Sequence, residues 1–157
     1  MNKPLVGVRI LDLTHMLAGP YAGMILADLG AETIKVEPLA GEGTRQLLAT
    51  DPENSLNGMG AYYLTLNRNK KSVAVDLKSE SGMAVFSRLV EASDIVLSNF
   101  AAEVPQRLGL DFETLSQVNP RIITCTVTGY GSEGPGANRP AFDQVAQASG
   151  GGMSITG

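Results

Sequence analysis

Runs of branched apolar residues alternate along the chain with segments whose apolar residues recur at helical spacing. The runs predict five strands, at residues 8–13, 33–36, 72–76, 94–98 and 122–127. The spacing predicts helices at residues 19–30, 79–91, 104–108 and 111–118, with a further helix starting near Phe142. Strands that alternate with helices predict an α/β fold with an open, mostly parallel sheet.

Local signals predict where the first two long helices begin and which faces they bury. Pro20 favours a helix start, Gly30 a helix end, and Ser79 can cap the second helix. We expect the core-facing side chains of the first helix to be Ala18, Ala22, Ile25, Leu26 and Leu29. Those of the second helix are Met83, Phe86, Leu89 and Val90.

The regular pattern breaks down between Pro38 and Ala61, where five Gly and Pro residues interrupt the chain. This stretch predicts a long loop with room for one short helix. Loops of this length within a domain are often functional, and an ordinary surface excursion is the alternative. Residues 62–66, which follow, fit a short strand or a short helix.

Composition limits the function classes. The 157 residues suit one domain, with 43% hydrophobic and 18% charged residues, and the net charge is -4. An acidic chain argues against nucleic-acid binding, and the sequence shows no targeting or membrane segment. The single Cys125 fits a reducing cytoplasm, and its place in a strand predicts a small buried side chain.

Motifs for common chemistries are weak or missing. Residues 129–134 match G-x-G-x-x-G after a strand, but Pro135 and Pro140 follow, so no helix is expected to open there. A nicotinamide-dependent oxidoreductase therefore remains a minor alternative. With one His and one Cys, a His/Cys metal site is not expected, and a Ser-His-Asp triad would have to use His15.

Basic residues near the predicted strand ends are candidates for binding an anionic ligand. A phosphate-rich nucleotide would need several of them to converge, because each phosphate is best held by a cation. Ligands of parallel α/β sheets bind outside the carboxyl ends of the strands. The candidate cations are Lys35, Arg45, Arg68, Lys70, Lys71, Lys78, Arg107 and Arg139.

Short motifs occur in order along the whole chain, at residues 8–14, 17–22, 26–38, 67–72, 94–100, 107–109, 128–131, 134–135, 139–143 and 147–151. Together they resemble the N-terminal part of family III CoA-transferases. This family contains formyl-CoA transferase, carnitine CoA-transferase and α-methylacyl-CoA racemase. The resemblance implies a Rossmann-like large domain with helices on both faces of the sheet, of which residues 1–157 are the N-terminal, CoA-binding part.

The resemblance also implies the reaction and the assembly. An Asp carboxylate attacks an acyl-CoA thioester, and the enzyme-bound anhydride and then thioester hand CoA to a second carboxylic acid. CoA and acyl-CoA are substrates, and no cofactor is bound permanently. Two chains form an interlocked homodimer. The nucleophilic Asp and a smaller second domain lie beyond Gly157, so we expect this segment alone to be inactive.

The resemblance also implies, by matching position, which residues bind the nucleotide end of CoA. Val75, Leu77 and Lys78 would line the adenine and ribose region. Asn99, Phe100 and Arg107 would hold the nucleotide, with Arg107 suited to phosphate.

Matching position likewise implies which residues lie at the reacting end of CoA. Leu17 and Ala18 would lie at the thioester. Arg139, Pro140, Phe142 and Asp143 would close over the pantetheine and the reacting centre, with Asp143 in a supporting catalytic role only.

Two positions depart from the family pattern. Formyl-CoA transferase has a Gln where this chain has Leu17, which can neither donate nor accept, so oxalate is not the expected substrate. The racemase branch has a His where this chain has Phe142, so no racemase activity is expected. A non-catalytic CoA-binding or interaction fragment is the alternative from another functional class.

Overall fold

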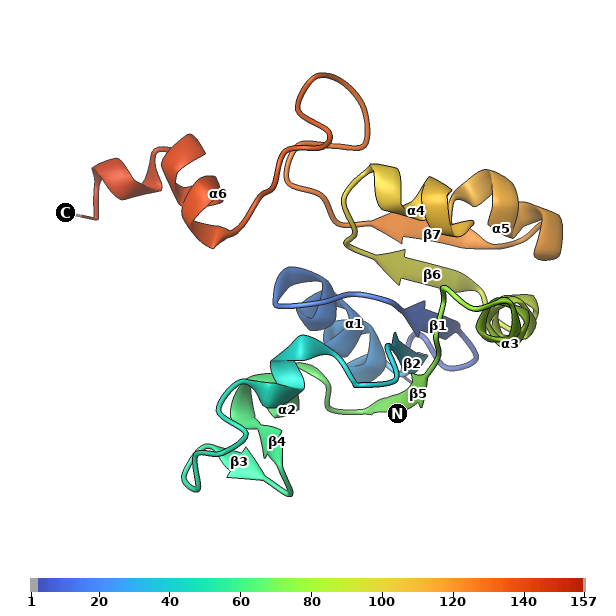
Figure 1. The fold of residues 1–157 in the computed structure, drawn as a ribbon, viewed down its shortest axis with the longest axis horizontal. Coiled ribbons are helices and arrows are strands. Elements are labelled where there is room, and N and C mark those ends of the chain that lie inside the picture. Colours follow the sequence, from blue (N-terminus) through green and yellow to red (C-terminus); the bar gives the residue numbers. More distant parts are fainter. Residues whose placement is uncertain (1–2, 157) are drawn as a thin grey trace.

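Five parallel strands form the central sheet of the computed structural model, which describes residues 3–156 (Figure 1). They are β1 (Arg9–Asp12), β2 (Glu32–Glu37), β5 (Lys70–Ala74), β6 (Ile95–Ser98) and β7 (Ile123–Thr126). Their order across the sheet is β5-β2-β1-β6-β7. The chain adds strands in one direction from β1 and then returns to add β6 on the other side. This reversal between β1 and β6 is the topological switch point of a Rossmann-like sheet.

Helices cover both faces of the sheet (Figure 1). On one face lies α1 (Ala18–Asp28), with α2 (Ala61–Leu66) beside it. The other face carries α3 (Glu80–Glu91), α4 (Glu103–Leu108) and α5 (Phe112–Val118), which bury the larger hydrophobic core. The predicted α/β class and the predicted strands and helices are confirmed to within a few residues at each end.

Helix α3 behaves as its sequence predicts. The Ser79 hydroxyl oxygen accepts a hydrogen bond from the Gly82 N–H at 3.0 Å, which caps the first turn. Phe86 and Val90 are fully buried between α3 and the sheet. An amphipathic helix with a matching cap needs only local sequence information, so this element could be predicted closely.

The predicted buried face of α1 is wrong for Ala18, Ile25 and Leu29, which are exposed, although Leu26 packs partly buried against the smaller core cluster. The buried residues of α1 are Gly19, Pro20, Gly23, Met24 and Ala27, while Ile25 and Leu29 are each 41% exposed. The helix presents mostly small residues to the sheet because it crosses directly over the buried ion pair of Lys70 and Asp12. A Cβ atom on Gly23 would lie only 2.6 Å from Asp12 Oδ2 and 3.2 Å from Lys70 Nζ.

We therefore expect the Gly23→Ala variant to be less stable than the parent by about 1–3 kcal/mol, because the added methyl group overpacks this contact. The higher helix propensity of Ala would by itself favour the variant by about 1 kcal/mol at most. Gly43→Ala is the control, since a Cβ at Gly43 meets nothing within 4 Å. Urea unfolding that finds Gly23→Ala as stable as Gly43→Ala would contradict the close approach.

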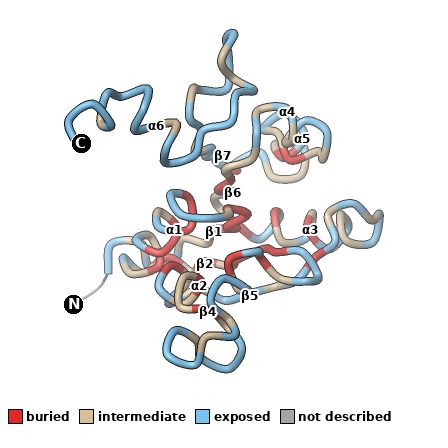
Figure 2. Tube along the Cα trace, turned by 60° about the vertical axis from the view of Figure 1, so that its left-hand side comes forward, coloured by how far each residue is buried: buried red, intermediate tan, exposed pale blue. Residues whose placement is uncertain are grey.

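The prediction that Cys125 is buried is also wrong. Cys125 is exposed, and Ile123, on the same face of β7, is 58% exposed. Strand β7 is an edge strand of the sheet, and Figure 2 shows exposed chain on this side of the molecule. A β-branched strand pattern indicates that a strand forms, but it does not say whether both faces of that strand are covered.

The predicted loop after β2 contains short ordered elements. These are the 3-10 helix η1 (Gly43–Gln46) and a hairpin of β3 (Ser55–Leu56) and β4 (Met59–Gly60). Residues 62–66 belong to the helix α2 rather than to a strand. The C-terminal elements α6 (Asp143–Ser149) and η2 (Gly152–Ser154) pack on each other and project away from the sheet (Figure 1).

Candidate functional site

The turns after β1 and β6 are tied together at the switch point. The Asn99 side chain accepts a hydrogen bond from the His15 N–H and donates one to the His15 carbonyl oxygen, both at 2.8 Å. The His15 and Phe100 rings pack with their centroids 5.1 Å apart. The crevice in which doubly wound sheets bind their ligands is thus bordered here by an amide bridge and two aromatic rings.

A pocket of about 380 Å³ opens beside this bridge, at the carboxyl ends of β1, β2 and β5. Its walls are largely apolar, and the exposed side chains of Asp76 and Lys78 stand among them. A pocket of this size and character suits a flat ring that carries charged groups at one end. The lining residues are Leu13, His15, Val36, Glu37, Pro38, Leu39, Val75, Asp76, Leu77, Lys78, Phe100 and Leu108.

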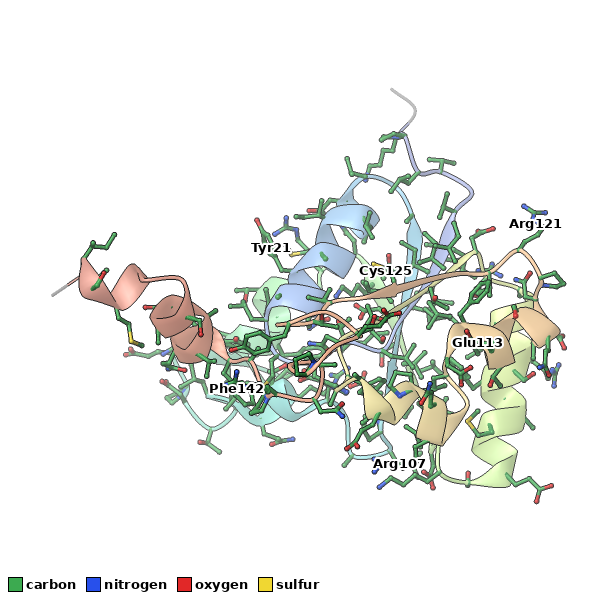
Figure 3. The ribbon with its side chains drawn as sticks, turned by 90° about the horizontal axis from the view of Figure 1, so that it is seen from above. Tyr21, Arg107, Glu113, Arg121, Cys125 and Phe142 are labelled. Carbon is green, nitrogen blue, oxygen red and sulfur yellow. The ribbon has the colours of Figure 1, made fainter. Side chains whose placement is uncertain are left out.

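The structure brings together most of the residues predicted for the nucleotide end. Val75, Leu77, Lys78 and Phe100 all line the pocket. Asn99 precedes Phe100, but both polar ends of its side chain are engaged by the His15 backbone. Arg107 is exposed on α4, next to the lining residue Leu108 (Figure 3).

The residues predicted for the reacting end are not gathered at the pocket. Leu17 and Ala18 are exposed at the start of α1. Arg139, Pro140, Phe142 and Asp143 are exposed in and before α6. In the described chain, the Arg139 guanidinium lies 5.5 Å from the Tyr130 ring centroid, and the Asp143 carboxylate accepts a bond from Gln147 at 2.6 Å.

Most of the candidate cations are engaged by other groups of the chain, some buried and some at the surface. Lys35 is fully buried and donates to the Thr14 carbonyl oxygen at 2.8 Å. Four others form ion pairs, which are Arg45–Glu37, Arg68–Asp28, Lys70–Asp12 and Lys71–Glu32. Among residues 3–156, Lys78, Arg107 and Arg139 form no ion pair within 4.0 Å, so their charges are available to a ligand.

The sequence analysis missed two buried carboxylates, Glu37 in the pocket wall and Glu42, which is bonded to it. Glu37 accepts two hydrogen bonds of 2.7 Å from Arg45, one from the Ser72 hydroxyl and one of 2.8 Å from the Glu42 N–H. Burial alone would raise the pKa of Glu37, but these bonds, led by Arg45, lower it to about 2. A carboxylate at the end of a buried strand, with an Arg eight residues later, was the available signal.

His15 also lines the pocket, and the resemblance did not assign it a role. Burial lowers the pKa of its imidazole below the ordinary 6.5, and the nearby Lys35 ammonium lowers it further. Glu42 and Asp12 act in the opposite direction but do not overcome these effects. His15 is therefore neutral at pH 7 and offers the pocket a ring for packing rather than a positive charge.

The Gly-rich segment does not have the geometry of a dinucleotide site. Gly131 and Gly134 adopt positive φ angles of 85° and 86°, and the next helix begins only at Asp143. The chain therefore does not enter a helix directly after this turn, as the dinucleotide fingerprint requires. The described residues contain no group of three His, Cys, Asp or Glu side chains that could hold a metal ion. No helix of residues 3–156 is long and apolar enough to cross a membrane.

Comparison with curated proteins finds relatives that are named as CoA-transferases. The chain is 46% identical over 156 residues to succinyl-CoA:glutarate CoA-transferase of Homo sapiens. It is 43% identical over 162 residues to succinate–glutarate CoA-transferase of Agrobacterium fabrum. These alignments cover 99% of this chain but only 35% and 40% of the relatives, so the chain spans well under half of their length.

Comparison with solved structures finds proteins of the same fold that are also similar in sequence. A CAIB/BAIF family protein from Brucella suis matches with a TM-score of 0.91 and 39% identity, over 100% of this chain and 42% of that one. Rv3272 from Mycobacterium tuberculosis matches with a TM-score of 0.85 and 41% identity, over 99% of this chain and 41% of that one. The model of CoA-transferase family III matches residues 5–157. The chain therefore belongs to CoA-transferase family III.

Proposed function

We propose that the full-length protein is an enzyme that transfers CoA from an acyl-CoA to a free carboxylic acid, and that this segment holds the CoA nucleotide. The observation that carries the proposal is that Val75, Leu77, Lys78 and Phe100 line one pocket at the carboxyl edge of the sheet. Apolar walls suit the two faces of an adenine ring. Lys78 and the nearby Arg107 supply positive charge for the phosphates.

The proposed chemistry uses an Asp carboxylate supplied from outside these residues. It attacks the thioester carbonyl, forms an acyl–aspartyl anhydride and releases the CoA thiolate. The thiolate then attacks the aspartyl carbonyl and expels the donor acid as its carboxylate, which leaves an aspartyl–CoA thioester. The acceptor carboxylate attacks this thioester and releases the CoA thiolate, and the thiolate attacks the acceptor's acyl carbonyl in the new anhydride. This last step gives the new acyl-CoA and frees the Asp carboxylate. Leu17 and Ala18 would contact the thioester end, and Arg139, Pro140 and Phe142 would close over the pantetheine.

The remaining parts of the proposal concern the reacting centre and the assembly. Asp143 would support the nucleophile rather than act as it. The protein would work as an interlocked homodimer in the cytoplasm, with no permanently bound cofactor. The relatives named for succinate and glutarate favour dicarboxylic acids as donor and acceptor, and the apolar Leu17 disfavours oxalate.

Transfer is tested by incubating the full-length protein with succinyl-CoA and, in turn, glutarate or oxalate, and following new acyl-CoA by mass spectrometry. Glutaryl-CoA formation with little oxalyl-CoA is expected. CoA binding without any transfer would favour a non-catalytic CoA-binding protein instead.

We expect Arg107→Ala in the full-length protein to weaken CoA binding by about 1.5–3 kcal/mol, the range for hydrogen bonds to a charged group. Arg121→Ala is the matched control. Arg121 is also exposed but precedes β7, and Figure 3 shows it at the upper right of the view, well away from Arg107 at the bottom. Calorimetric titration that gives the same CoA affinity for Arg107→Ala and Arg121→Ala would remove Arg107 from the site.

A further inference from the structure

A second buried carboxylate, Glu42, connects the pocket with the turn after β1. Glu42 is only 3% exposed, and its N–H donates to Oε2 of the pocket residue Glu37 at 2.8 Å. One oxygen of its carboxylate accepts the Met16 N–H at 3.3 Å, and the other accepts the Thr44 hydroxyl. A continuous set of hydrogen bonds therefore runs from the pocket wall through Glu42 to the backbone of Met16.

The Met16 backbone needs such support. Its φ angle is +65°, in the left-handed region that a long side chain rarely adopts, and such residues persist only where surrounding contacts hold them. Leu17 follows directly, and α1 begins at Ala18 without any side-chain hydrogen bond at its cap and without an acidic residue in its first turn. The contact from Glu42 to Met16 therefore adds to the Asn99 bridge at His15 in fixing the direction in which the chain enters α1.

Glu42 is itself held firmly. Three residues on, Arg45 forms its two bonds of 2.7 Å to Glu37, donates to the Tyr63 hydroxyl at 2.6 Å and lies 3.9 Å from the Tyr63 ring centroid. The hairpin also packs closely here, since a Cβ on Gly60 would fall 1.5 Å from the Leu47 carbonyl oxygen. The segment that carries Glu42 is thus anchored to the sheet and not to the turn alone.

We propose that Glu42 is a positioning residue that holds the Met16–Leu17 turn in a fixed relation to the nucleotide pocket. It acts through the Met16 N–H and does not touch the substrate. A CoA whose nucleotide end lies in the pocket then meets Leu17 and Ala18 at one defined place. This inference rests on the proposed function, because it concerns the alignment of the reacting end.

The test compares Glu42→Ala, Glu42→Gln and Glu42→Asp in the full-length protein. Gln keeps an acceptor for the Met16 N–H without the charge, while Asp keeps the charge but shortens the reach. We expect Ala and Asp to lower kcat at least about tenfold, since a small misplacement of reacting groups is costly. Gln should stay within about threefold of the parent, and the CoA dissociation constant should change little in all three, because other residues line the pocket.

Glu53→Ala is the control, because Glu53 is an exposed Glu in the same segment between β2 and α2. If Glu42→Ala does not fold, the contrast between Gln and Asp still decides the question. An unchanged kcat in Ala or Asp, or a loss in Gln equal to that in Asp, would overturn the positioning role. A loss of CoA affinity as large as the loss of kcat in the Ala or Asp variant would overturn the positioning role as well. A parent protein that neither binds nor transfers CoA would instead refute the proposed function. The parent is therefore measured first, before any variant is compared with it.

Discussion

Replacement of Lys70 by Met is expected to lower the free energy of unfolding by about 3–5 kcal/mol, the cost of leaving one partner of a buried ion pair alone. The side chains of Lys70 and Asp12 are 1% and 0% exposed. Lys70 Nζ donates to Asp12 Oδ2 at 2.7 Å, to the Pro20 carbonyl oxygen at 2.8 Å and to Asn67 Oδ1 at 3.0 Å. In the variant, the Asp12 carboxylate would keep only its bonds from Thr14.

The neighbouring lysine is a matched control. Lys71 also pairs with a carboxylate, Glu32 at 2.5 Å, but its side chain is 72% exposed. Lys71→Met should therefore cost only about 0–1 kcal/mol. The double variant Asp12→Asn/Lys70→Met should recover part of the loss, because no charge is then left buried without its partner. Equal urea midpoints for Lys70→Met and Lys71→Met would show that the buried pair does not stabilise the fold.

Acid should weaken the fold through Glu37. Burial opposes its ionisation, yet the bonds from Arg45, Ser72 and the Glu42 backbone hold its pKa at about 2, below the ordinary 4.5. A carboxyl group whose pKa is lower in the folded state stabilises the fold above its unfolded pKa. That stability is present above about pH 4.5 and is lost as the pH falls toward 2. The difference between the two pKa values corresponds to about 3 kcal/mol.

Urea unfolding at several pH values between 7 and 3 measures this contribution. Glu37→Gln should be less stable than the parent at pH 7, and the difference should shrink as the pH falls. Glu32→Gln serves as the control, because Glu32 also has two basic partners, Arg9 and Lys71, but lies at the surface. A stability difference between Glu37→Gln and the parent that is the same at every pH would contradict the assignment.

The sequence was sufficient for those features that depend on neighbouring residues. The apolar periodicity of residues 79–91 and the Ser79 hydroxyl define α3 locally, and the structure agrees. The family resemblance also placed Val75, Leu77, Lys78 and Phe100 together, and the structure brings these four residues to one pocket. Motif order along the chain was enough for the family.

The sequence was not sufficient where the partner of a residue lies far along the chain. Lys70 and Asp12 are 58 positions apart, and only the pairing of β5, β2 and β1 brings them together under α1. That buried pair then requires Gly23 above it, which turns the larger residues Ile25 and Leu29 outward.

By itself, then, the sequence determined which segments become strands and helices, the parallel α/β class and the family, since periodicity, caps and motifs are local. The tertiary structure alone decided which charges are buried. It also decided which face of α1 meets the sheet, that Cys125 on the edge strand is exposed, and that Glu37 and Glu42 link the pocket to Met16. The physical reason is that burial and ion pairing depend on how distant elements pack, and no short stretch of sequence records that packing.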